Sequence, residues 1–109
     1  MIDEYFRNAV VMRIIDGDSI EAEIDLGFEK LRTTRIVRLL GINAPEKNTL
    51  EGQAAHQHLI WLLPIGTKIV TQTINKRDKY GRYLARVYRD RVLINQLMID
   101  DGFAVATTY

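Results

Sequence analysis

The chain has 109 residues, which suits one compact domain, and we expect a single domain over residues 1–109. Hydrophobic content of 47% and charged content of 27% are typical of a globular protein, and the lack of cysteine excludes disulfides and thiolate metal sites. The net charge is only +1, but the charges are unevenly distributed along the chain. Residues 14–29 hold six acids without Lys or Arg, whereas residues 76–91 hold seven basic residues. Such charged runs are usually solvated faces. However, an acidic segment that could bind a cation and a basic segment that could bind phosphates are together also what phosphodiester chemistry needs.

Membrane insertion and secretion both lack support in the sequence. No apolar run approaches the roughly 18 residues that a membrane helix requires. The N-terminus carries early acids and a broken apolar stretch, unlike a signal peptide, although a processed precursor would look the same. We therefore expect no membrane partner and favour an intracellular location, while the compartment stays unknown.

Strand patterns dominate the first 42 residues. Residues 9–15 predict a first strand, and Asp16-Gly17 is a tight-turn signal. Residues 18–26 alternate strictly between apolar and polar side chains, as a half-buried strand does. Residues 35–42 predict a third strand.

The remainder predicts two helices and two more strands. Asn48 with Glu51 resembles a capping box, and a helix should run from there to about residue 63, where Pro64 and Gly66 end it. Strands are expected at residues 67–73 and 83–88, and a short helix near residues 93–98 should end at Gly102. The order predicts a mainly β protein with helices (α+β), built as a five-stranded OB-fold-like β-barrel with two helices.

Three motifs hold the candidate chemistry. DGDS at residues 16–19 offers the oxygens that Ca²⁺ or Mg²⁺ prefers, although an ordinary turn is its commoner meaning. RLLGINAPE at residues 38–46 leaves a strand and fixes a polar cluster with a rigid proline. DKYGR at residues 78–82 adds a basic turn, and the planar fork of an arginine pairs bidentately with phosphate.

The three motifs in this order and spacing resemble the staphylococcal nuclease (thermonuclease) family. The resemblance runs from about residue 10 to residue 106 and includes EGQAA and NQLMIDDGFA. It implies the same five-stranded barrel. It also implies a Ca²⁺-dependent phosphodiesterase that acts on DNA and RNA and leaves 3′-phosphate ends.

The resemblance assigns a metal site and a water-activating group. It implies that Asp18 is the first metal carboxylate, that Asp16 supports the same turn, and that Ala44 contributes its backbone carbonyl. Asn43 stands where the family supplies its second metal carboxylate. Glu46 matches the glutamate that orients or deprotonates the attacking water.

The resemblance also assigns the groups around the substrate. Arg38 and Arg82 match the two arginines that bind the phosphate and stabilise its developing charge. Lys79 and Tyr80 match residues beside the nucleotide, and Tyr109 matches an aromatic residue near the base. DNA, RNA or both are the expected substrates.

Two departures from the family pattern favour alternatives. Asn43 brings a dipole in place of a charge, so Ca²⁺ should bind more weakly, and a non-catalytic nucleic-acid-binding or protein-binding barrel is the rival reading. The family continues into another helix beyond the position of Tyr109, so we expect a second copy or a partner to cover apolar barrel surface. His56 and His58 lie two apart on the predicted helix and should point in different directions, which argues against a joint ligand role.

Overall fold

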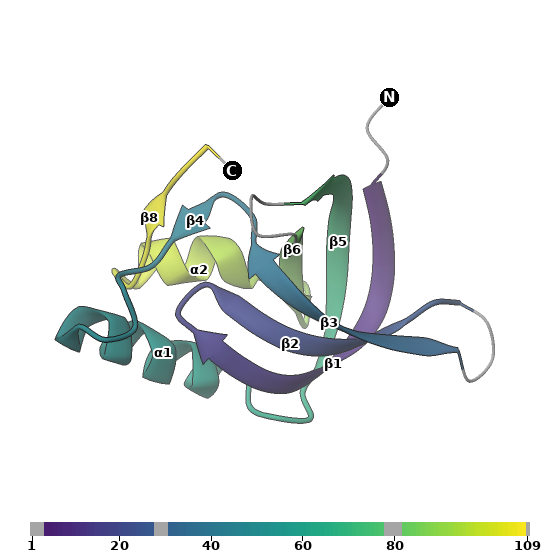
Figure 1. Ribbon diagram of the computed structural model, residues 1–109, viewed down its shortest axis with the longest axis horizontal. Helices are drawn as coiled ribbons and strands as arrows, with labels where there is room; N and C mark the ends of the chain where they lie inside the picture. The colour runs from purple at the N-terminus through teal and green to yellow at the C-terminus, as the bar shows by residue number, and fades with distance from the viewer. Residues whose placement is uncertain (1–3, 28–30, 78–81, 109) are drawn as a thin grey trace.

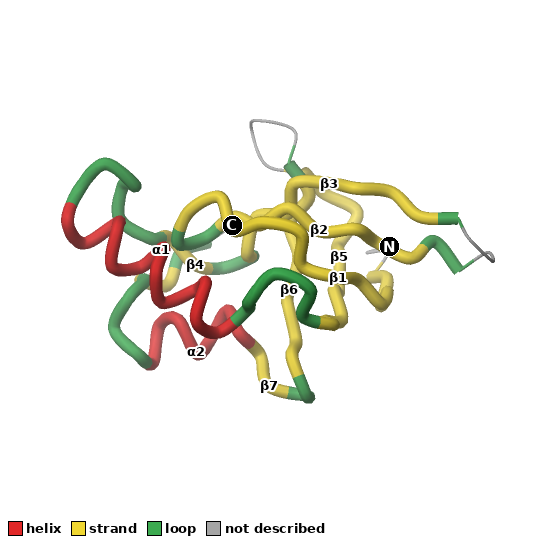
Figure 2. Tube along the Cα trace, turned by 90° about the horizontal axis from the view of Figure 1, so that it is seen from below, coloured by secondary structure: helices red, strands yellow, loops and turns green. Residues whose placement is uncertain are grey.

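The molecule is a closed barrel of five strands with two helices packed on one side of it (Figure 1). The computed structural model describes residues 4–27, 31–77 and 82–108, without the side chains of residues 4–5 and 75–77. Figure 2 shows the two helices lying side by side, away from the long β2–β3 hairpin. Within these residues, no helix is long and apolar enough to cross a membrane.

Five strands form the barrel wall, and their hydrogen-bonded order is β3-β2-β1-β5-β6. They are β1 (Glu4–Asp16), β2 (Ser19–Asp25), β3 (Arg32–Leu39), β5 (Lys68–Arg77) and β6 (Tyr83–Arg89). Neighbours in this order are antiparallel. A short parallel pairing between β3 and β6 then closes the barrel, with Arg38 opposite Leu84 at its centre. We call this pairing the seam. The predicted five-stranded OB-like barrel is confirmed.

Three two-residue strands were not predicted. They are β4 (Ile42–Asn43), β7 (Val92–Leu93) and β8 (Val105–Ala106), and β4 pairs with β8. The predicted third strand over residues 35–42 is wrong at its end, because β3 stops at Leu39 and a turn separates it from β4. Gly41 has φ +81° in that turn, a left-handed conformation that glycine adopts without a steric penalty.

Both predicted helices are present. They are α1 (Leu50–Leu62) and α2 (Ile94–Asp100). The predicted capping box at Asn48 is wrong by one residue, because the N-cap is Thr49, whose side chain accepts a hydrogen bond from Gly52 N at 3.0 Å. Gly102, at φ +85°, follows the second helix as expected.

The core fills the barrel and continues under the helices. The alternation predicted for the second strand holds, since Ile20, Ala22 and Ile24 are all buried. One face of α1 is also buried, and its Leu59 is completely inaccessible to solvent. Because this core fixes the ends of β1, β3 and β6 relative to α1, the loops at those ends are held in place.

Candidate active site

The turn between β1 and β2 is fixed by contacts on two sides. Asp18 N donates to Asp16 Oδ1 at 3.0 Å, so the first carboxylate of the DGDS motif stabilises the turn. Gly17 has no room for a side chain, because a Cβ there would lie 2.7 Å from Ala44 Cβ and 2.8 Å from Ala55 Cβ. The turn therefore packs directly against α1 and the loop after β4.

Asp18 is a buried carboxylate with several donors around it. Its Oδ2 accepts a hydrogen bond from Ala44 N at 2.9 Å and lies 3.5 Å from Arg38 Nη2, and its Oδ1 accepts one from Ser19 Oγ at 3.2 Å. Burial raises the pKa of Asp18 above its usual 3.8, and the neighbouring Asp16 raises it further. The Ala44 N–H and the Arg38 guanidinium oppose this rise in pKa.

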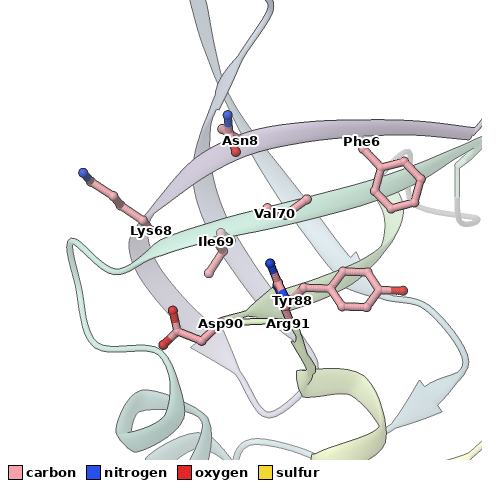
Figure 3. A pocket seen from close by; sticks show the side chains of 8 residues that line it. All are labelled: Phe6, Asn8, Lys68, Ile69, Val70, Tyr88, Asp90 and Arg91. Atoms are coloured by element: carbon pink, nitrogen blue, oxygen red, sulfur yellow. The ribbon is translucent and has the colours of Figure 1, made fainter.

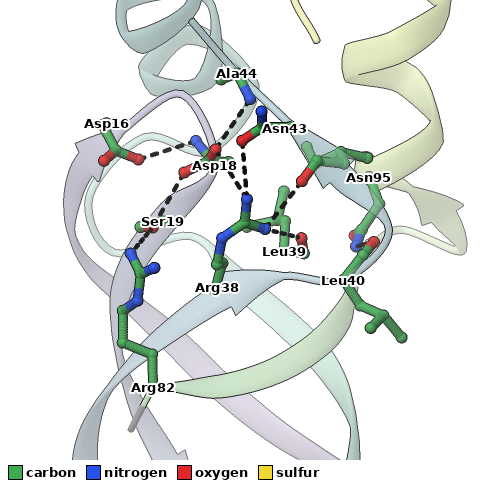
Figure 4. A network of polar contacts seen from close by, with 11 residues as sticks. Asp16, Asp18, Ser19, Arg38, Leu39, Leu40, Asn43, Ala44, Arg82 and Asn95 are labelled. Atoms are coloured by element: carbon green, nitrogen blue, oxygen red, sulfur yellow. Dashed lines mark hydrogen bonds and ion pairs between the residues drawn. The ribbon is translucent and has the colours of Figure 1, made fainter. Parts of the chain in front are cut away.

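Arg38, near the end of β3, makes hydrogen bonds to several segments of the site (Figure 4). Its Nη1 donates to the carbonyl oxygens of Leu39 and Ile42 at 3.1 and 2.9 Å. Its Nη2 donates to Asn43 Oδ1 at 3.1 Å and pairs with Asp18. Only 4% of Arg38 is exposed, so this guanidinium fixes the turn between β3 and β4 from inside.

Arg82 approaches the same cluster from the other side of the seam. It directly precedes β6, and its Nη1 donates to Ser19 Oγ at 3.2 Å (Figure 4). The register pairs the last residues of β3 with the first residues of β6, so Arg38 and Arg82 lie on neighbouring strands at the seam. The two arginines thus converge on neighbouring residues of one turn, Asp18 and Ser19.

Glu46 lies on the exposed loop between β4 and α1. Its backbone carbonyl accepts from Thr49 N at 3.0 Å and from Thr49 Oγ1 at 2.7 Å, which joins the loop to the helix cap. A Cβ on Gly52 would collide with that same carbonyl. Within the described residues, the Glu46 carboxylate makes no hydrogen bond or ion pair. Its backbone is therefore held closely while its side chain faces solvent.

The oxygens of this cluster fit a hard cation in their chemistry. Asp18 and Asn43 both direct a side-chain oxygen toward Arg38 Nη2, so the two oxygens lie around one point. The Ala44 backbone reaches Asp18 directly, and Asp16 lies beside it. Carboxylate and amide oxygens are ligands that Ca²⁺ prefers. Within residues 4–27, 31–77 and 82–108, however, no three Asp, Glu, His or Cys side chains gather into a metal cluster.

Two residues of the cluster were not singled out from the sequence. Ser19 connects Asp18 to Arg82, and a serine after a DGD turn carries no distinctive signal. Asn95, 3% exposed, accepts from Val87 N at 2.9 Å and donates to Leu40 O at 2.9 Å and Ala85 O at 3.1 Å. It anchors the turn between β3 and β4 to β6 and α2. A buried asparagine at the start of an apolar helix was the available signal.

The other residues considered from the sequence lie away from the cluster around Asp18 or outside the described residues. Lys79, Tyr80 and Tyr109 fall outside the described residues. The two histidines point apart as expected, since His56 Nε2 lies 2.9 Å from Ile14 O and His58 Nε2 lies 2.7 Å from Asp101 Oδ2. Neither belongs to the cluster around Asp18.

The fold and site define a small OB-type barrel with arginines and carboxylates gathered at its seam. The family model that matches residues 36–109 is described as "Staphylococcal nuclease homologue". The chain is 38% identical over 95 residues to an uncharacterised endonuclease of Escherichia coli O157:H7, covering 86% of this chain and 57% of that protein. It is 35% identical over 113 residues to micrococcal nuclease of Shigella flexneri, covering 95% of this chain and 60% of that protein. The chain therefore belongs to the staphylococcal nuclease homologue family, and it spans a little over half the length of these relatives.

Proposed function

We propose that this barrel is a nuclease that hydrolyses phosphodiester bonds of DNA or RNA with the help of a divalent cation, Ca²⁺ in the first place, and leaves 3′-phosphate ends. The observation that carries the proposal is the convergence of Arg38 and Arg82 on the Asp18–Ser19 turn. Two guanidiniums beside a carboxylate suit a phosphate whose negative charge grows in the transition state. Family membership and relatives named endonuclease and micrococcal nuclease support the same activity.

The two arginines have different tasks in this proposal. Arg82 is half-buried, and its planar fork is suited to bidentate pairing with a phosphate that lies beside Ser19. Arg38 is almost fully buried, and its hydrogen bonds to the β3–β4 turn hold Asn43 in place. Arg38 therefore contributes positive charge next to the phosphate from a fixed position.

The cation would be held by the Asp18 carboxylate, the Asn43 amide oxygen and the Ala44 carbonyl, with Asp16 supporting the turn. When bound, Ca²⁺ would supply positive charge at the phosphate and acidify a bound water. Glu46 would orient or deprotonate the attacking water, because its carboxylate faces solvent from a loop fixed by Thr49. Lys79, Tyr80 and Tyr109 stay predicted contacts to the nucleotide.

The test is cleavage of single-stranded DNA, plasmid and RNA with Ca²⁺, Mg²⁺, Mn²⁺ or a chelator present. We expect cleavage with Ca²⁺, its loss in chelator, and its loss in Arg82→Ala. Arg32→Ala is the matched control, since Arg32 is a half-exposed arginine that pairs with Glu23 on the β2–β3 hairpin. Absence of cleavage under every metal condition would overturn the proposal.

Asn43 favours a second candidate, a barrel that binds nucleic acid or protein without catalysis. Asp18 is left as the main charged metal ligand, and Arg38 already occupies its Oδ2. Ca²⁺ affinity falls as ligand charge is removed. Retained oligonucleotide binding with no cleavage under any metal condition would favour this second function.

A further inference from the structure

A groove on the outer wall of the barrel lies outside the candidate active site. It has a volume of about 510 Å³ and is lined by side chains of β1, β5, β6 and the turn after β6 (Figure 3). Phe6 and Tyr88 lie on one side of it, and Lys68 projects from the other. Tyr88 lies six residues along β6 from Arg82, so about 20 Å of strand separates the groove from the candidate active site.

The groove contains one ring that is largely exposed to solvent and one that is half-buried, those of Phe6 and Tyr88. Phe6 is 65% exposed although it is an apolar residue on a strand. The hydroxyl of Tyr88 donates to Gln72 Oε1 at 3.1 Å, which fixes the second ring over the sheet. The cross-strand register places Asn8, Val70 and Tyr88 in one row across three strands, and it places Phe6 opposite Gln72 in the next row on the same face.

The groove contains two cations, Lys68 and Arg91. Within the described part of the chain, neither Lys68 nor Arg91 makes a hydrogen bond or ion pair, whereas Asp90 lies 4.0 Å from Arg89 Nε. Lys68 and Arg91 outnumber Asp90, so the lining of the groove carries a net positive charge beside the rings of Phe6 and Tyr88.

The turn that carries Arg91 is strained. Asp90 and Arg91 have φ +49° and +68°, and the left-handed region is costly for residues other than glycine, asparagine and aspartate. The two positive φ values indicate a type I′ hairpin turn, whose second central position strongly favours glycine. The chain instead places an arginine there, with its side chain in the groove.

We propose that this groove, formed by Phe6, Lys68, Val70, Tyr88 and Arg91, is a second binding site for a single-stranded nucleic acid. Unpaired bases would stack on the two rings, and Lys68 and Arg91 would pair with phosphates. A duplex keeps its base faces stacked internally, so the exposed rings select single strands. The proposal deepens the proposed function, because the groove would hold a strand away from the point of cleavage.

The test is the affinity for a fluorescent oligodeoxythymidylate of about 16 nucleotides, measured by anisotropy in chelator so that no cleavage is needed. We expect Phe6→Ala to weaken binding by about tenfold. Trp61→Ala is the matched control, since Trp61 is a 72% exposed ring on α1, and it should bind like the parent.

Arg91→Gly separates binding from folding. The substitution relieves the positive φ, so the variant should unfold at a higher temperature while binding the oligonucleotide more weakly. The slope of log affinity against log salt concentration should also become shallower, by the amount that about one phosphate contact contributes. Affinity equal to that of the parent in both Phe6→Ala and Arg91→Gly would overturn the proposal. A protein would then be the expected partner of the groove.

A dinucleotide substrate distinguishes this proposal from the proposed function. It is too short to extend from Arg82 to the groove, so its cleavage should be the same in the parent, Phe6→Ala and Arg91→Gly. If the parent cleaves nothing, the nuclease proposal fails while the binding measurement still decides on the groove. A parent that binds no single strand in chelator would overturn the second site.

Discussion

Asn43 Oδ1 accepts a hydrogen bond from Arg38 Nη2 at 3.1 Å, and this nitrogen also pairs with Asp18. Asn43→Asp adds a charge at unchanged size, so we expect Ca²⁺ to bind about tenfold more tightly. In chelator, the new carboxylate would repel Asp16 and Asp18 but attract Arg38, so the loss of stability should be small. Calorimetric titration with Ca²⁺ measures the first effect, and an unchanged affinity would place Asn43 outside the proposed metal site.

The raised pKa of Asp18 has a defined effect on stability. A folded-state pKa above the unfolded value means that the folded protein holds the proton more tightly, so stability falls as pH rises from 3.8 through the folded pKa. Asp18→Asn removes this penalty while the amide oxygen can still accept from Ala44 N. The variant also leaves the buried Arg38 guanidinium without its carboxylate partner, so the expectation is comparative: relative to the parent in chelator, Asp18→Asn should be more stable at pH 7 than at low pH.

Urea unfolding of Asp18→Asn and the parent at both pH values measures this difference. The same variant should lose Ca²⁺ binding, which separates the metal role of the carboxylate from its cost to the fold. A variant less stable than the parent at pH 7 in chelator would show that the Arg38 and Ala44 contacts outweigh the burial of the charge.

The two arginines should respond differently to truncation. Arg82→Ala removes a half-buried side chain, so cleavage should fall by about 10²–10³ while the melting temperature changes little. Arg38→Ala leaves a buried carboxylate and two turn carbonyls without their donor, so it should also destabilise the fold by about 3–5 kcal/mol. Thermal melts beside cleavage rates separate the two cases, and equal melting temperatures would contradict the difference.

The first turn of α1 presses on the loop that carries Glu46. Gly52→Ala would normally stabilise a helix by about 1 kcal/mol, but the added Cβ meets the Glu46 carbonyl. We therefore expect a loss of about 1–3 kcal/mol and slower cleavage, because the loop must move. Gln53→Ala, an exposed change in the same turn, should alter stability by less than about 0.5 kcal/mol. A stabilised Gly52→Ala variant would mean that the loop yields easily.

Long elements could be predicted from the sequence, and short ones could not. The alternation in residues 18–26 identified β2, because seven residues display the period of a strand clearly. Strands β4 and β8 have two residues each and no period, and only their mutual pairing defines them. The N-cap was misplaced because Asn48 and Thr49 are both good caps, and the Glu46–Thr49 turn selects the second.

The fold of the whole barrel creates contacts of the candidate site that could not be predicted from the sequence. The family resemblance predicted one site for Asp18, Arg38 and Asn43, and the structure brings their polar atoms into contact. The burial of Arg38 could not be predicted, because its acceptors are carbonyls of a turn that only the β3–β4 break creates. Likewise, the role of Asn95 depends on three backbone groups from distant segments.

The seam that brings the arginines together is the shortest pairing in the barrel wall. It contains three registered pairs, whereas β2 and β3 share seven. The candidate site thus lies at the shortest strand pairing of the barrel wall, and local opening there would separate Arg38 from Arg82 while the core stays packed. We expect cleavage to fail on heating a few degrees before the far-ultraviolet circular dichroism changes. Amide exchange at Leu40, which donates across the seam to Ala85 O, should be faster than at the centre of β2. Heat would then stop the proposed cleavage reversibly, before the barrel unfolds and becomes prone to aggregation.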